Sequence, residues 1–254
     1  DPRAVEAAIT DKTKAIIVVH LFGQPAPMDG FLELARKYDL KIIEDCAQSH
    51  LAQYRGQTTG LMGDCGAFSF YPTKNLGGLT EGGLCVSRHP EMVEQFRLLR
   101  NHAMLDRYTY SDVGYNYRME GFAGALLDVK AKHLSAWTER RRAIAAKYLA
   151  ELNLDGIRLP AVLAEGPSVY HQFSICFPQR DALVNHLTNK GVATGLFYPR
   201  PLHLQPVFEG LGFKEGDFPI AEQTCLEIIN LPIYAELSDK QVEYVIEIVN
   251  TFET

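Results

Sequence analysis

Two side chains with chemical potential lie where predicted strands end. Asp45 closes the apolar segment KIIED (41–45), and Lys74 follows the segment GAFSFY (66–71), 29 residues further along the chain. Ligands of open parallel sheets bind beyond the carboxyl ends of the strands, so reactive groups are expected at this edge. The spacing alone fits either a plain salt bridge between carboxylate and ammonium or a catalytic pair.

A lysine in a pocket suggests a more specific chemistry. Its amine can form a Schiff base with an aldehyde cofactor such as pyridoxal phosphate. That cofactor also needs an acid that keeps its pyridine nitrogen protonated, and Asp45 suits this role. Gln48 could hydrogen-bond the edge of the cofactor ring, and Ser69 could reach a phosphate oxygen. Neither a P-loop motif nor a GxGxxG motif occurs, so nucleotide-binding loops of those types are not indicated.

The elements that must position these residues alternate between strand and helix patterns. The segment AIIVVH (15–20) is a continuous apolar run, which predicts a strand buried on both faces. A helix is predicted over GFLELARKYDL (30–40), with Asp29 as its N-cap. The two strands named above follow it. This alternation favours parallel β-α-β units, and therefore an α/β fold with a mostly parallel central sheet flanked by helices.

The second part of the chain reads as a smaller α+β region. Its patterns, together with those just before it, predict helices over 90–104, 119–152 with a break near Trp137, 180–190 and 238–252, and strands over 170–177 and 192–197. We therefore predict a large cofactor-binding domain over residues 1–135. A small C-terminal domain with its connecting helix is predicted over residues 136–254.

Composition excludes several classes of protein. A net charge of -6 and a pI near 5.8 argue against a general nucleic-acid surface. Five cysteines without a CxxC pair do not form a disulfide framework or a zinc knuckle, which fits a reducing cytoplasm. No apolar run reaches the roughly 18 to 20 residues of a membrane span. The histidines show no metal-ligand spacing, so we expect no metal.

Several motifs together resemble the sugar aminotransferases of the DegT/DnrJ/EryC1/StrS family, fold-type I enzymes that use pyridoxal phosphate. The motifs occur in the family's order over essentially the whole chain: IIEDCAQSHLAQYRGQTTGLMGDCGAFSFYPTKNLGG, GYNYRMEGFAGALLDVKAKHL, YHQFSI, FYPRPLHLQP and INLPIYAELS. The resemblance implies an aminotransferase that moves an amino group from an amino acid, with glutamate as the favoured donor, to a nucleotide-linked keto-sugar.

The resemblance also implies residue roles. Lys74 in YPTKNLG matches the lysine that binds the cofactor and shuttles the proton, and Asp45 matches the acid at the pyridine nitrogen. Gln48 matches a second cofactor contact and Ser69 a phosphate ligand. Asn116 in GYNYRM matches an asparagine that reaches the phosphate of the neighbouring subunit, which implies a homodimer with shared active sites.

The sequence departs from the family pattern in two places. Ala123 stands where members usually carry glutamine, so one polar contact near the dimer region is lost. Members also have a segment before the position of Asp1 that holds a strand and a phosphate-binding helix. We therefore expect this sequence to contain only part of the cofactor site, and to catalyse transamination poorly when made by itself.

Weaker candidates and alternatives stay open. Tyr198 and His203 lie in a proline-rich loop and could line the sugar-nucleotide entrance, or could simply pack the small domain. An aromatic stretch is interpreted as dimer-interface packing: Tyr108, Tyr110, Tyr115 and Tyr117. Two alternatives to the aminotransferase are a dehydratase of the same family and a non-catalytic regulatory homologue. The retained Lys74 argues against the sugar dehydratases of the family, in which this lysine is replaced, but leaves open cyclohexane-type dehydratases that keep it. The retained lysine, acid and serine argue against the regulatory homologue.

Overall fold

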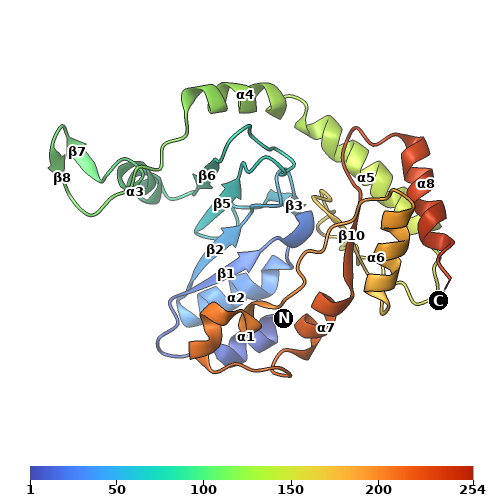
Figure 1. Cartoon of the computed structure of the whole chain (residues 1–254). Helices are drawn as coiled ribbons and strands as arrows, with labels where there is room; N and C mark the ends of the chain where they lie inside the picture. Colours follow the sequence, from blue (N-terminus) through green and yellow to red (C-terminus); the bar gives the residue numbers. More distant parts are fainter. Residues whose placement is uncertain (254) are drawn as a thin grey trace. The chain divides into compact units, whose positions relative to one another are not determined.

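The computed structural model describes residues 1–253 and divides into two compact units (Figure 1). The first unit comprises Asp1–Glu139 and Val162–His171. The second comprises Arg140–Ala161 and the chain from Gln172 onward. The chain therefore leaves the first unit, returns to it for ten residues, and leaves it again. The division predicted between residues 135 and 136 stays a prediction, because compactness does not by itself establish domains.

A four-stranded sheet organises the first unit. Its strands are β1 (Ala15–Val19), β2 (Lys41–Asp45), β5 (Cys65–Ser69) and β6 (Gly83–Val86), in the order β1-β2-β5-β6. The first three are parallel and β6 is antiparallel to β5. The predicted α/β fold with a mostly parallel sheet is thereby confirmed. The register places Val19, Asp45 and Ala67 side by side across the three parallel strands.

Helix α2 (Met28–Tyr38) contributes buried residues to the core of this unit, and α1 (Pro2–Ala8) packs the partly buried Val5 against that core. The buried cluster comprises Ile16, Val18, Met28, Leu34, Leu40, Ile42 and Tyr54. On β1 the residues alternate, since Ile16 and Val18 are buried whereas Ile17 is 66% and Val19 45% exposed. The prediction that this strand is buried on both faces is wrong for the described chain. An unbroken apolar run does not reveal which face is covered.

The start of α2 also differs from the prediction. Pro27 holds the N-cap position, so Asp29 lies in the first turn of the helix. There Asp29 accepts a hydrogen bond from the Tyr54 hydroxyl at 3.0 Å and pairs with Arg55 at 3.0 Å. Tyr54 belongs to the small hairpin of β3 (Gln53–Tyr54) and β4 (Gln57–Thr58). The acid therefore ties this hairpin to the helix.

An arm extends from the sheet within the first unit (Figure 1). It contains α3 (Pro90–Leu99), β7 (Met104–Asp106) and β8 (Thr109–Tyr110), and α4 (Gly121–Ala131) follows. Large apolar side chains are exposed along it: Leu105, Tyr108, Tyr110, Val113, Tyr115, Tyr117, Met119 and Phe122. The Tyr115 and Tyr117 rings stack 4.9 Å apart. This segment presents an apolar surface that is unusual for an exposed arm.

The second unit packs helices against a two-stranded antiparallel sheet. Its elements are α5 (Leu134–Glu151, from Arg140 onward), β9 (Phe173–Cys176), α6 (Arg180–Asn189), the 3₁₀ turns Leu202–Leu204 and Pro206–Leu211, α7 (Pro219–Glu227), β10 (Ile228–Leu231) and α8 (Asp239–Asn250). The helix predicted over 119–152 breaks at residues 132–133 and not at Trp137. The strand predicted over 192–197 is reduced to one bridge between Gly195 and Asn230. Within residues 1–253, no helix combines the length and apolarity needed to cross a bilayer.

Candidate active site

The carboxyl ends of β1, β2 and β5 meet at one edge of the sheet. Asp45 is the last residue of β2 and Ser69 the last of β5, and Lys74 follows Ser69 by five residues. Because parallel strands place their carboxyl ends together, these three residues come from neighbouring strand ends. These residues therefore lie at the edge of the sheet where the sequence predicted reactive groups.

Lys74 and Asp45 interact electrostatically. The pKa of Lys74 is lowered from its ordinary value, because partial burial disfavours the charged ammonium; the Asp45 carboxylate acts in the opposite direction and favours it. The Asp45 Oδ1 atom accepts a hydrogen bond from the Ala47 backbone N–H at 3.0 Å, which orients the carboxylate. An amine with a lowered pKa has a larger neutral, nucleophilic fraction near neutral pH.

A tight loop carries Lys74. Its backbone N–H donates to the Tyr71 carbonyl at 2.9 Å, and the Gly78 N–H donates to the Phe70 carbonyl at 2.8 Å. A Cβ at Gly77 would lie 2.2 Å from the Pro72 carbonyl oxygen, so only glycine allows the loop to close this far. The Ser69 Oγ accepts from the Tyr71 N–H at 3.2 Å and leaves its own O–H free to rotate.

Gln48 supports a neighbouring loop. Its Oε1 atom accepts a hydrogen bond from the Phe22 N–H at 2.6 Å, and its side chain is buried. Phe22 has a positive φ of 59° in the short 3₁₀ turn Leu21–Gly23, directly after β1. Gln48 therefore fixes a strained turn at the sheet edge, a contact that the sequence did not suggest.

His50 is a residue that the sequence analysis missed. It is 5% exposed, and its two ring nitrogens are the buried side-chain atoms in residues 1–253 that lack a hydrogen-bond partner. Its ring lies 5.3 Å from Phe68 and 5.9 Å from Phe70. Burial, followed by the charge of Lys74, lowers the pKa of His50 to about 4; the Ser69 backbone opposes this shift without completing a hydrogen bond. A neutral imidazole whose nitrogens make no hydrogen bond within residues 1–253 therefore lies beside Lys74.

A buried network anchors the strand on its other face. The carboxylate of Glu44 accepts hydrogen bonds from His20 Nε2 at 2.9 Å and from the backbone N–H groups of Gly60, Met62 and Gly63 at 2.7 Å each. His20 Nδ1 accepts from the Ala26 N–H at 3.0 Å. Burial pushes the pKa of Glu44 upward, but these hydrogen bonds together outweigh it and leave that pKa lowered.

The same network resembles a metal site in outline. Ligand atoms of His20, Glu44 and Cys46 lie within 4.8 Å of one another. However, both nitrogens of His20 and both carboxylate oxygens of Glu44 are already hydrogen-bonded. Burial, followed by the charge of Glu44, raises the pKa of the Cys46 thiol to about 12, so it stays protonated. We interpret the cluster as structural.

Replacing Glu44 by Gln is expected to destabilise the protein by roughly 3 kcal/mol or more. The amide NH2 faces donors where the carboxylate accepted four hydrogen bonds, so at least one buried donor loses its partner. Urea unfolding measures the difference. The control Glu94→Gln removes an exposed acid that pairs with Arg97, and is expected to cost less than about 1 kcal/mol. Equal losses in the two variants would contradict the anchoring role.

The sign of the associated pH dependence follows from the lowered pKa of Glu44. Its contribution is fully present above the pKa of an unfolded glutamate and is lost as pH falls through the lower folded value. In Glu44→Gln, the free energy of unfolding should therefore decrease less steeply as the pH is lowered into the acidic range.

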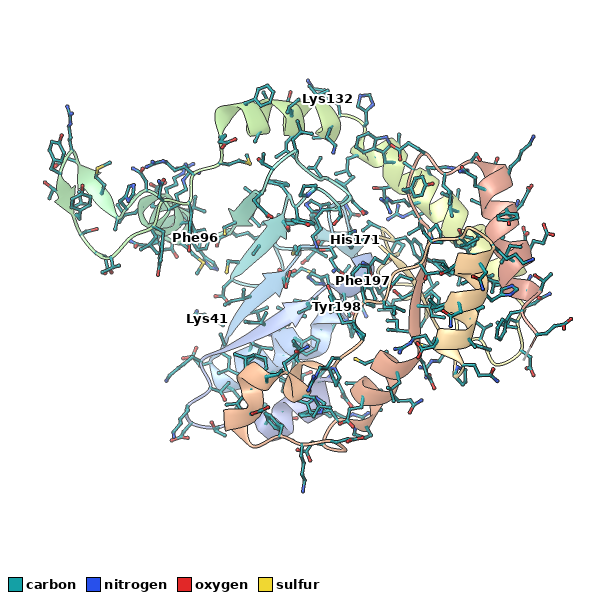
Figure 2. All side chains as sticks on the ribbon, in the orientation of Figure 1. Lys41, Phe96, Lys132, His171, Phe197 and Tyr198 are labelled. Atoms are coloured by element: carbon teal, nitrogen blue, oxygen red, sulfur yellow. The ribbon has the colours of Figure 1, made fainter. Side chains whose placement is uncertain are left out.

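The structure places the remaining predicted residues elsewhere. Asn116 is exposed in the arm, where it forms an isolated bridge with Asn101. Tyr198 and His203 belong to the second unit (Tyr198 is labelled in Figure 2). His203 Nε2 contacts Glu222 at 2.9 Å, and Glu222 also accepts from the Gly216 and Phe218 backbones. Ligand roles for these residues stay predictions.

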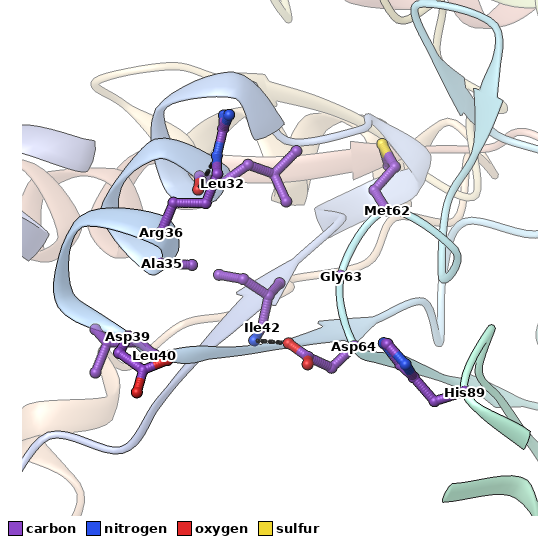
Figure 3. Close-up of a pocket in the computed structure, with 10 residues that line it drawn as sticks. All are labelled: Leu32, Ala35, Arg36, Asp39, Leu40, Ile42, Met62, Gly63, Asp64 and His89. Atoms are coloured by element: carbon purple, nitrogen blue, oxygen red, sulfur yellow. Dashed lines mark hydrogen bonds between the residues drawn. The ribbon is translucent and has the colours of Figure 1, made fainter. Parts of the chain in front are cut away.

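A cavity of the first unit lies away from this chemistry. A cavity of about 560 Å³ is bounded by the end of α2, the start of β2 and the loop before β5 (Figure 3). Its lining residues are Leu32, Ala35, Arg36, Asp39, Leu40, Ile42, Met62, Gly63, Asp64 and His89. Asp64 accepts from the Ile42 N–H at 2.8 Å. This is the amino end of the strands, so the cavity is separate from Lys74 and Asp45.

Comparisons with known proteins agree with the geometry. The pattern of the DegT/DnrJ/EryC1/StrS aminotransferase family matches residues 1–250. A pleiotropic regulatory protein of Geobacillus stearothermophilus is 43% identical over 99% of this chain and 68% of its own length. A dTDP-3-amino-3,4,6-trideoxy-alpha-D-glucose transaminase of Streptomyces venezuelae is 42% identical over 98% of this chain and 66% of its own length. The chain thus spans about two thirds of these relatives.

Solved structures show the same fold. S. venezuelae DesV, solved in complex with a ketimine intermediate, superposes with a TM-score of 0.95 at 42% identity, over 98% of this chain and 68% of that one. The PLP-form of the protein Spr1654 from Streptococcus pneumoniae superposes with a TM-score of 0.90 at 25% identity, over 99% of this chain and 71% of that one. The fold-type I assignment is confirmed. The chain belongs to the DegT/DnrJ/EryC1/StrS aminotransferase family.

Proposed function

We propose that this protein is a pyridoxal-phosphate-dependent aminotransferase that moves an amino group from an amino acid, with glutamate as the preferred donor, to a nucleotide-linked keto-sugar. One observation carries the proposal: a partly buried lysine of lowered pKa that interacts with a carboxylate at the carboxyl edge of a parallel sheet. Similarity to named sugar transaminases over nearly the whole chain supports it.

The residues at the sheet edge fit this cofactor. Pyridoxal phosphate, when bound, supplies an aldehyde that condenses with amines and a protonated ring that withdraws electrons. Lys74 would hold the aldehyde carbon, Asp45 the ring nitrogen and Ser69 the phosphate. The two buried ring nitrogens of His50 make no hydrogen bond within residues 1–253, so this edge offers polar atoms that a bound group could contact.

The chain's own groups account for binding and proton movement. The neutral fraction of Lys74 would act as a nucleophile towards the cofactor aldehyde, and the same amine would be placed to carry a proton to and from the substrate carbon that bears nitrogen. The Asp45 carboxylate, oriented by the Ala47 N–H, would hold a proton at the ring nitrogen. His50 stays neutral at physiological pH and adds no competing charge beside the lysine.

We further propose that the ketone is at C3 of the sugar. Relatives at 39–42% identity are named as transaminases that form or use 3-amino or 3-dehydro sugars linked to dTDP or UDP. The test is to incubate the full-length protein, glutamate and a dTDP- or UDP-linked 3-keto-sugar, and to detect the amino-sugar by mass spectrometry. Product from the 4-keto substrate but not from the 3-keto substrate would overturn the C3 assignment, and absence of product from both would also overturn the proposed aminotransferase.

A regulatory role is the second candidate, because a relative at 43% identity is named a pleiotropic regulatory protein. A scaffold without chemistry has no need for a lysine of lowered pKa. Visible absorbance of the protein with pyridoxal phosphate, lost in Lys74→Ala, separates an enzyme from a scaffold.

We propose a homodimer with shared sites, in which Asn116 contacts the phosphate held by the neighbouring subunit. The exposed apolar arm supports this, because such a surface is usually covered by a partner. The double variant Val113→Glu/Tyr117→Glu is expected to shift the protein towards monomer by at least about tenfold in Kd. Light scattering after gel filtration measures this. The control Ile220→Glu, at an equally exposed position on α7, should leave the dimer intact. A stable, fully active monomer would contradict the proposal.

A further inference from the structure

A short segment of the chain returns to the first unit between two pieces of the second. Residues Val162–His171, here called the return segment, form backbone contacts with two loops of the first unit. The Arg55 N–H donates to the Glu165 carbonyl at 2.6 Å, and the Val169 N–H donates to the Gly23 carbonyl at 2.9 Å. Gln24 Nε2 donates to the Gly166 carbonyl at 2.5 Å. The segment is therefore bound along its length.

The return segment also holds the residue that follows Lys74. Asn75 Nδ2 donates to the Val169 carbonyl at 3.1 Å, and Asn75 Oδ1 lies 3.2 Å from His171 Nδ1. An amide oxygen only accepts, so His171 carries its proton on Nδ1. Asn75 is 7% and His171 8% exposed, which protects both bonds from water. Figure 2 labels His171 on the ribbon.

The far side of the return segment is closely packed. Gly23 has a φ of +94°, and a Cβ there would lie 2.8 Å from the His171 backbone nitrogen. The turn that ends at Gly23 is the one fixed by Gln48 through Phe22. Contacts thus run continuously from Gln48, through the turn and the return segment, to Asn75.

We propose that the return segment is a positioning strap for Lys74: Asn75 and His171 fix the backbone of the lysine loop, so that the amine stays partly buried beside Asp45. The inference rests on the proposed function, in which Lys74 is the reactive amine. Asn75 and His171 are positioning residues, since neither needs to touch substrate or cofactor. A pair of apolar side chains could fill the same space, but only directed hydrogen bonds at both amide atoms define the orientation of residue 75.

The strap is expected to affect the reactivity of Lys74, which a contact that only stabilised the fold would not do. The pKa of Lys74 is lowered by burial, while Asp45 opposes that effect; the charge of Lys74 in turn acts on His50. If the loop loosens, the amine gains water and its pKa rises towards the ordinary value. Release of the strap should therefore move the pH dependence of lysine reactivity upward.

The test uses the full-length protein with pyridoxal phosphate as the probe. Lys74 is trapped with borohydride at a series of pH values and quantified by peptide mass spectrometry. In Asn75→Ala and in His171→Leu, we expect roughly tenfold slower trapping at neutral pH and a midpoint at higher pH. The double variant should be no worse than Asn75→Ala, because that variant already removes the hydrogen bond to His171. His171→Asn keeps a donor near the Nδ1 position and should restore the midpoint.

Three comparisons decide the outcome. The control Asn185→Ala removes an exposed asparagine of α6 and should match the unaltered protein. If Asn75→Ala does not fold, Asn75→Asp replaces it, since this variant keeps the His171 partner and loses the donor to Val169. Lower thermal stability with an unchanged trapping midpoint would overturn the strap and leave the proposed function intact. Failure of Lys74 to react faster than other lysines in the unaltered protein would overturn both.

Discussion

Replacing Lys74 by Ala in the full-length protein is expected to lower the turnover of amino transfer by about 10⁴-fold or more, because nucleophile and proton carrier are lost together. The fold should survive, since the Lys74 backbone bond to Tyr71 does not involve the side chain. Steady-state turnover with glutamate and a nucleotide-linked 3-keto-sugar gives the rate. The visible absorbance that depends on a lysine-linked cofactor should also disappear in Lys74→Ala.

The matched control is Lys132→Ala, which removes an exposed lysine that pairs with Asp128 on α4. It should leave turnover within about twofold of the unaltered protein, as surface pairs contribute little. Retention of a tenth or more of the activity by Lys74→Ala would show that another group is the nucleophile.

The second large effect is expected at Asp45. Asp45→Asn keeps an oxygen that can accept from the Ala47 N–H, so the turn after β2 is preserved. The amide cannot hold a proton at the pyridine nitrogen, and turnover is expected to fall by about 10² to 10⁴-fold while the cofactor stays bound. Turnover measurements and cofactor titration by absorbance test the two parts separately.

The same variant has a signature in pH. The Asp45 carboxylate favours the charged form of Lys74, so its removal should lower the pKa of the lysine further. The midpoint of Lys74 trapping should then move to lower pH, opposite to the shift expected from release of the strap. Asp128→Asn, an exposed acid on α4, is the control. Near-normal turnover in Asp45→Asn would remove the residue from the mechanism.

Strand ends were the part of the site that sequence could predict. A strand pattern fixes where the chain reaches the edge of a parallel sheet, so Asp45 and Lys74 follow from local signals. His50 gave no such signal, because its burial depends on Phe68 and Phe70 across the sheet edge. The partnership of Asn75 with His171 joins residues 96 positions apart, and no local pattern encodes a contact of that separation.

The fold was predictable to a similar depth. Periodicity identified β2, β5, α6 and α8, whose patterns are strong. The covered face of β1 was not predictable, since its five residues are all apolar and both faces look alike. The break between α4 and α5 was predicted near Trp137 but lies at residues 132–133, because Lys132 and His133 are ordinary helix residues that give no local signal.

Strand β2 carries two consecutive acids, and its two-residue period sends them to opposite faces. Glu44 points into the buried network and Asp45 towards the edge where Lys74 lies. One face of the strand therefore stabilises the fold, and the other face carries the residue proposed for the chemistry. Either acid can therefore be replaced without disturbing the contacts of the other. A single inserted or deleted residue within Lys41–Asp45 would exchange their faces and disable both at once.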